Sequence, residues 1–68
     1  LLSSKQIETI LLQHGFVFVS AKGSHVKYRK AGSPTQTVIV PANRKKIPHG
    51  TLRSIVRQSG LDTEIFLF

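Results

Sequence analysis

Gly23-Ser24-His25-Val26-Lys27-Tyr28-Arg29 is the stretch that decides the fold of this chain. Lys22-Gly23 is a turn signal, and the residues that follow alternate in polarity as a β-strand does. Side chains two residues apart share one face of a strand. Val26 and Tyr28 are therefore expected to face a core. The other face carries His25, Lys27 and Arg29, so the stretch predicts a strand with an imidazole beside two cations.

An amphipathic helix is predicted ahead of this strand, over about residues 4–14. Ser3 and Gln6 have the spacing of a capping box, and Gly15 supplies a left-handed stop. The apolar stripe of the helix is formed by Ile7, Ile10 and Leu11. Leu12 falls off this stripe and is a candidate for a second contact surface.

Two more strands are predicted, one on each side of the first in sequence. Phe16-Val17-Phe18-Val19 is β-branched and aromatic throughout. Because this strand is apolar on both sides, we expect it to be more covered than a half-exposed strand. Residues 20–24 are expected to form the turn, and the central strand to run to about Lys30. Thr37-Val38-Ile39-Val40 is the third strand, which Pro41 ends by withdrawing a donor.

A second helix is predicted near Pro48, whose φ angle is preset for a helix start. Thr51 is a candidate cap for a helix that begins one residue later. The buried stripe of this helix is expected to be Leu52, Ile55 and Val56. Gly60 terminates it, and Asp62 is a candidate cap for a last helical turn.

This order of elements predicts a single α+β domain over residues 1–68. Short links between consecutive strands favour a three-stranded antiparallel sheet. Both helices are expected on one face of the sheet, since neither can bury its apolar stripe alone. The order α-β-β-β-α, with a short helical turn at the end, is also that of a double-stranded-RNA-binding domain.

Charge is the strongest feature of the composition. Ten Lys and Arg stand against three Asp and Glu, and the net charge is +7. No acid occurs between Ala21 and Arg57. Such segregation indicates a surface for a polyanion, nucleic acid above all, although a merely solvated cationic surface is the alternative. The candidate RNA contacts in this span are Lys22, Lys27, Arg29, Arg44, Lys45, Lys46, Arg53 and Arg57.

Membrane and disulfide classes are disfavoured by the same composition. The chain has no cysteine, so it has neither a disulfide framework nor a thiolate metal site. No apolar run approaches the roughly 20 residues that span a bilayer, and nothing at its start has the form of a signal peptide. We expect a cytoplasmic domain that makes no membrane contact.

Histidine chemistry is the catalytic hypothesis. When RNA is cleaved by its own 2′-hydroxyl, a group must remove that proton, stabilise the phosphorane and assist the leaving oxygen. Histidine titrates near neutrality, so His25 can do the first or third task. Lys27 and Arg29 are candidates for stabilising phosphoryl charge. Metal-dependent hydrolysis is disfavoured, because the three acids are scattered and the three histidines lack ligand spacing.

Each candidate has an alternative interpretation. His25 could contact phosphate without catalysis, and Ser24 could be a turn residue rather than a supporting catalytic group. Arg44-Lys45-Lys46 is a solvated loop, a phosphate clamp or a docking point for an acidic partner. His49 is a candidate peripheral RNA contact, and His14 is most simply a favourable partner of the helix dipole.

Several blocks of the chain together resemble the HicA family. They are Gly15-Phe16, Lys22-Gly23-Ser24-His25 with Lys27-Tyr28-Arg29, Val38-Ile39-Val40-Pro41, and Pro48-His49-Gly50-Thr51-Leu52-Arg53-Ser54-Ile55 with Gln58 and Gly60. The blocks occur in the order of the family, and the resemblance extends from about Ser4 to Phe66. Many family members carry a second histidine where this chain has Val26, which the strand phase places on the packed side.

The resemblance implies a small mRNA interferase toxin of a type II toxin–antitoxin system, with a fold like that of double-stranded-RNA-binding domains. It implies an endoribonuclease that blocks translation and needs no metal or other cofactor. Its catalytic histidine maps to His25. It also implies neutralisation by a HicB-type antitoxin, which we expect to cover His25 in a hetero-oligomer, while the free chain is a monomer. The alternative is an RNA-binding module of the same fold that does not cleave.

Overall fold

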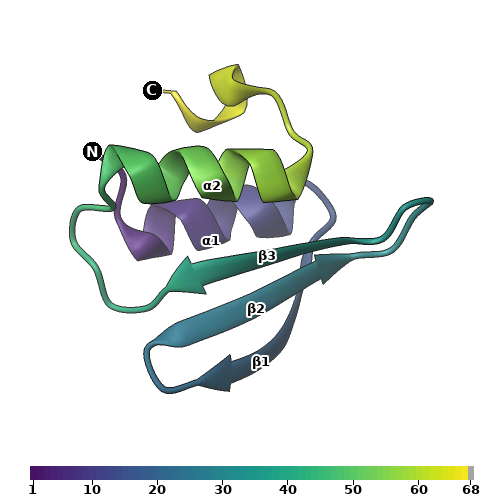
Figure 1. Ribbon diagram of the computed structural model, residues 1–68, viewed down its shortest axis with the longest axis horizontal. Coiled ribbons are helices and arrows are strands. Elements are labelled where there is room, and N and C mark those ends of the chain that lie inside the picture. The colour runs from purple at the N-terminus through teal and green to yellow at the C-terminus, as the bar shows by residue number, and fades with distance from the viewer. Residues whose placement is uncertain (68) are drawn as a thin grey trace.

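The computed structural model describes residues 1–67. Its elements are α1 (Ser4–Gln13), β1 (Val17–Lys22), β2 (His25–Lys30), β3 (Gln36–Pro41), α2 (His49–Ser59) and a 3-10 helix (Thr63–Phe66). The strands form an antiparallel sheet in the order β1-β2-β3. Both helices lie on one side of this sheet (Figure 1). The predicted α+β fold is confirmed.

The helix ends follow largely from local sequence. Ser3 Oγ accepts from the Gln6 amide at 3.1 Å, and Gln6 Oε1 accepts from the Ser3 amide at 2.9 Å, which completes the predicted capping box. Gly60 ends α2 in the left-handed conformation, with φ at 70°. Asp62 precedes the 3-10 helix as predicted, but its carboxylate makes no capping hydrogen bond.

The predicted helix start near Pro48 is confirmed, whereas the alternative in which Thr51 caps the helix is wrong. The helix begins at His49, directly after Pro48, and Thr51 lies inside its first turn. The φ of Pro48 is −58°, close to the helical value, so the ring pre-organises the chain one turn earlier than a threonine cap would.

The turn between β1 and β2 is shorter than predicted. Residues 20–22 belong to β1, and Gly23 and Ser24 alone connect the strands. Gly23 has φ at 60°, the conformation that tight hairpin turns favour and that glycine adopts without steric cost. A turn of this length fixes the register, and Lys22 therefore pairs directly with His25.

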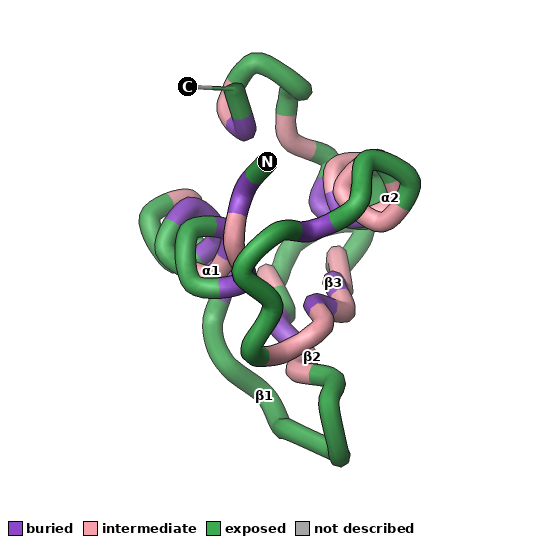
Figure 2. The backbone as a smooth tube through the Cα atoms, turned by 90° about the vertical axis from the view of Figure 1, so that its left-hand side faces the viewer, coloured by how far each residue is buried: buried purple, intermediate pink, exposed green. Residues whose placement is uncertain are grey.

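The expectation that the Phe16–Val19 stretch is covered is also wrong, except at Phe16 itself, which is buried. Every residue of β1 is exposed (Figure 2). The physical reason is strand order: β1 is an edge strand, whereas both helices pack against β3 at the other edge. β1 also contains a β-bulge, because Phe18 pairs with Tyr28 and Ser20 with Lys27, which leaves Val19 as an extra residue.

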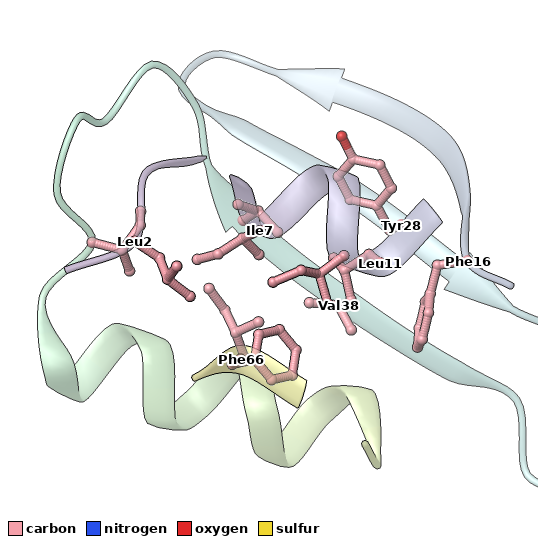
Figure 3. Packing of buried hydrophobic residues seen from close by; sticks show 11 residues of the cluster. Leu2, Ile7, Leu11, Phe16, Tyr28, Val38 and Phe66 are labelled. Atoms are coloured by element: carbon pink, nitrogen blue, oxygen red, sulfur yellow. The ribbon is translucent and has the colours of Figure 1, made fainter. Parts of the chain in front are cut away.

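The apolar core lies between the sheet and the two helices (Figure 3). Its largest fully buried members are Phe16, Phe66, Ile7, Leu11, Ile47 and Ile55. Tyr28 is confirmed as a core residue, with 3 % of its surface exposed. Its hydroxyl donates to the Glu8 carboxylate on α1. Burial, together with this carboxylate, raises the pKa of Tyr28 above its ordinary value.

Ser4 fastens the link between β3 and α2 to the start of α1. This serine is 3 % exposed. Its hydroxyl donates to the Pro41 carbonyl at 2.5 Å and accepts from the Arg44 amide at 2.9 Å. The Ser4 amide in turn donates to the Arg44 carbonyl at 2.9 Å. The first half of the link is therefore held by three hydrogen bonds from one residue.

At the other end of α2, Gly60 lies close to the Gln36 side chain of β3, and Gln58 makes a hydrogen bond to the same strand. A Cβ added at Gly60 would overlap the Gln36 side-chain amide, so this position accepts only glycine without rearrangement. Gln58 Oε1 accepts from the Ile39 amide at 3.0 Å. Because β3 is an edge strand, this bond satisfies a backbone donor on its outer side.

Candidate functional site

The face of the sheet opposite the helices is assembled from cross-strand rows. Residues directly opposite each other on neighbouring strands share a face. From the β1–β2 turn outward, the rows are Lys22–His25–Pro41, Ser20–Lys27–Ile39 and Val17–Arg29–Thr37. The burial pattern agrees with the predicted alternation, because His25 and Arg29 are exposed and Tyr28 is buried. We call this surface the open face.

His25 stands at one end of the open face, at the first position of β2. A shallow hollow of about 260 Å³ lies beside it. The hollow is lined by Ser20, Lys22, His25, Val26, Lys27 and Ile39. Lys22 from β1 and Lys27 from β2 both line this hollow, so two lysines lie beside one solvent-accessible imidazole. Such an arrangement suits a phosphate whose negative charge grows during a reaction.

The predicted basic loop begins beside the turn that carries His25. The Ala42 amide donates to the Ser24 carbonyl at 2.7 Å, which joins the two segments. Asn43 follows with φ at 58°, a left-handed conformation that asparagine tolerates. Arg44, Lys45 and Lys46 come next and are exposed. The structure thus brings this cationic run to the same end of the sheet as His25.

Three other predicted cations lie further away. Arg29 is on the open face, but in the row at the opposite end of the ladder. Arg53 and Arg57 are exposed on α2, in the helix layer on the other side of the sheet (Figure 1). Arg57 lies near Gly60, at the end of α2 that contacts Gln36 at the start of β3, far along the sheet from His25.

The remaining polar candidates have local structural contacts. Ser24 is an exposed turn residue whose carbonyl is engaged with Ala42. His14 follows α1, with Nδ1 2.8 Å from the Ile10 carbonyl oxygen. His49 is the exposed first residue of α2. Residues 1–67 contain no group of three or more His, Asp or Glu side chains placed to hold a metal ion.

Two features of the site were missed from the sequence. Ile39 forms a wall of the hollow, and the strand pattern of β3 combined with a register would have placed it there. Ser4 anchors the basic loop from 37 and 40 residues away. No local pattern marks such a long-range contact, because Ser4 also reads as an ordinary first residue of a helix.

A family comparison agrees with this geometry. The model of the HicA toxin of bacterial toxin–antitoxin systems matches residues 4–61, from the start of α1 to just beyond α2. The chain belongs to the HicA toxin family. This confirms the resemblance that the sequence blocks indicated, and the chain is thereby a toxin of a toxin–antitoxin system. A comparison with curated proteins finds no match. None of the helices in the described part of this HicA-family chain is long and apolar enough to cross a membrane.

Proposed function

We propose that this HicA-family toxin is a metal-independent endoribonuclease that cleaves mRNA and thereby blocks translation. The observation that supports the proposal best is the Lys22–His25 pair on the open face. An accessible imidazole there lies beside cations in a chain of net charge +7. Basic surfaces of this kind hold nucleic acid through its phosphates.

In the proposed reaction the 2′-hydroxyl of the RNA attacks the adjacent phosphorus. The bond to the 5′-oxygen breaks, which leaves a 2′,3′-cyclic phosphate and a 5′-hydroxyl end. His25 removes the 2′ proton or donates one to the leaving oxygen, and a positioned group of this kind contributes roughly 10²–10⁴ in rate. Lys22 and Lys27 stabilise the charge of the phosphorane. Ser24 has at most a supporting role, because it lies in the turn that precedes His25.

RNA is proposed to be held mainly through its backbone. The three rows of the open face contain no phenylalanine, tyrosine or tryptophan on which bases could stack. Exposed cations are available instead, in the turn region and in the Arg44–Lys46 run beside it. A strand of RNA that passes His25 can therefore place neighbouring phosphates against this run.

Cleavage in the presence of EDTA tests the proposal. We expect wild-type protein to cut mRNA in EDTA, and His25→Ala to cut at least about a hundredfold more slowly, since it lacks the acid–base group. His14→Ala is the matched control, because that imidazole bonds to its own helix, and it should cut as the wild type does. An RNA with a 2′-deoxy sugar at the cut position should resist.

Failure to cut any RNA, with binding retained, would contradict the nuclease proposal. It would favour the second candidate, an RNA-binding module of the same fold. Cleavage of the 2′-deoxy substrate would contradict the proposed attack by the 2′-hydroxyl.

We also propose that the antitoxin is of the HicB type and covers His25. Family membership supports the existence of an antitoxin, and the net charge of +7 supports an acidic one. The cytoplasm, where mRNA is translated, is the proposed setting. A free monomer and a hetero-oligomer with antitoxin remain the expected states.

A further inference from the structure

The edge strand β1 exposes apolar side chains away from the His25 end of the sheet. Val17 is 60 % exposed, Phe18 58 % and, on the neighbouring α1, Leu12 54 %. Val19 at the bulge is exposed as well. Single exposed apolar residues are ordinary on a soluble domain, whereas neighbouring ones that form a continuous strip mark a binding surface.

Phe18 and Leu12 lie on the helix side of the sheet, away from His25. Phe18 pairs with Tyr28 and packs against its ring edge-on, with 6.2 Å between the ring centroids. Tyr28 in turn contacts Glu8, which is one helical turn before Leu12 on the same face of α1. The exposed rim formed by Leu12 and Phe18 therefore runs along the outside of α1 and β1. We call it the β1 rim.

The two edges of the sheet differ in how far other segments cover them. On β3 the Gln58 side chain accepts from a backbone amide of the strand, and α2 packs alongside. Along β1, the hydrogen bonds within residues 1–67 run to β2 and none comes from another segment on its outer side. The bulge at Val19 interrupts this edge, but no other segment covers it, so the residues on either side of the bulge are available to pair with another strand.

We propose that the antitoxin docks on the β1 rim, adding a strand to the outer edge of β1 and placing apolar side chains against Phe18 and Leu12. Strand addition of this kind draws affinity from backbone hydrogen bonds and specificity from side-chain contacts. The antitoxin is chosen as occupant because family membership supplies such a partner. A second copy of the chain is disfavoured, because two copies of charge +7 repel each other.

The β1 rim is distinct from the proposed reaction site. His25 pairs with Lys22 on the open face at the turn end of the β1–β2 ladder, whereas Phe18 pairs with Tyr28 near the other end and on the helix side. The β1 rim would hold the antitoxin on the toxin. A second part of the antitoxin would have to reach His25 to stop cleavage. The inference rests on the toxin role of the family and does not require that the chain cleaves RNA.

The test compares binding by three variants to the antitoxin of the same module, co-produced and purified with the toxin. We expect Phe18→Ser and Leu12→Ser each to raise Kd by about tenfold or more, as loss of an apolar anchor does. Leu67→Ser is the matched control, because Leu67 is 63 % exposed but follows the 3-10 helix, and its Kd should stay within about twofold. Cleavage of RNA by the free variants should equal that of the wild type.

Amide hydrogen exchange along β1 gives a second readout. Strand addition should slow exchange at those amides of residues 17–21 that point away from β2, and should leave the amides already bonded to β2 little changed. Wild-type affinity in both rim variants, a larger loss in Leu67→Ser, or unchanged exchange at β1 would each overturn the proposal. A free wild-type dimer that Phe18→Ser dissolves would assign the rim to a second copy instead. If wild-type protein cleaves no RNA, the affinity measurements still decide this inference.

Discussion

Tyr28 joins the two layers of the domain, since its ring lies in the core and its hydroxyl reaches Glu8 on α1. The folded state raises the pKa of this phenol, so it binds the phenolic proton more tightly than the unfolded chain does. The resulting stabilisation is fully present below the ordinary tyrosine pKa of about 10. It is lost progressively as the pH rises above that value.

Tyr28→Phe should therefore change the alkaline stability of the protein. Near pH 7 the variant should lose about 1 kcal/mol of the free energy of unfolding, the usual worth of one hydrogen bond. From about pH 8 to about pH 11 the wild type should lose more stability than the variant, because only the wild type titrates the phenol. Urea unfolding at both pH values measures this, and equal losses would show that Tyr28 is not the alkaline group.

The side of the sheet on which a residue lies was predicted correctly where the alternation of one strand decides it. The two-residue period of β2 was enough to place His25 outside and Tyr28 inside, because one face of the strand had to be buried. The bond from Tyr28 to Glu8, which lies 20 residues earlier, could not be predicted. It depends on how α1 is seated over the sheet, and this is a property of packing.

At the scale of elements, the link from β3 to α2 depends on a single anchor. Ser4 bonds to Pro41 and Arg44 while almost completely buried. Ser4→Ala should cost about 1–3 kcal/mol of unfolding free energy, because it leaves partners without hydrogen bonds. It should also weaken RNA binding, since the basic run loses its fixed position.

Thr9→Ala is the control for this change. Its hydroxyl bonds only to the Lys5 carbonyl on the exposed side of α1, so its removal should change stability by less than about 0.5 kcal/mol. Urea unfolding and RNA titration of both variants make the comparison. If Ser4→Ala and Thr9→Ala have the same stability and the same RNA affinity, Ser4 does not anchor the loop.

Elements with clear end signals were predicted well. The capping box of α1 and the glycine after α2 are local chemistry, and the structure has both. The environment of β1 was not predicted, because an apolar strand has the same sequence whether it is central or at an edge. Its bulge and the short turn at Gly23 also depend on how the register is finally paired.

For the whole molecule, the charge distribution predicts a strong salt dependence of RNA binding. Arg44→Ala should lower the slope of log K against log salt on single-stranded RNA by about 0.7, the value for one lost phosphate contact. The physical reason is that one fewer counterion is released. An unchanged slope would take Arg44 out of the RNA surface.

Arg57→Ala locates the limit of that surface. Arg57 is an RNA-contact candidate, yet it lies in the helix layer at the end of α2 remote from the His25 turn. If Arg57→Ala lowers the salt slope as much as Arg44→Ala does, the RNA surface extends around the domain to α2. A wild-type slope would confine RNA to the open face and the adjoining loop.

The extra residue in β1 has a consequence for changes in chain length. If residue 19 were deleted, Phe18 would still stand opposite Tyr28 and Ser20 opposite Lys27, now in an unbroken ladder. A deletion there shortens the chain without changing the neighbours of His25. The Gly23-Ser24 turn has no such spare residue, and an insertion in it would separate Lys22 from His25. Relatives that differ by one residue ahead of the turn are therefore expected to keep the same site, and those that differ within it are not.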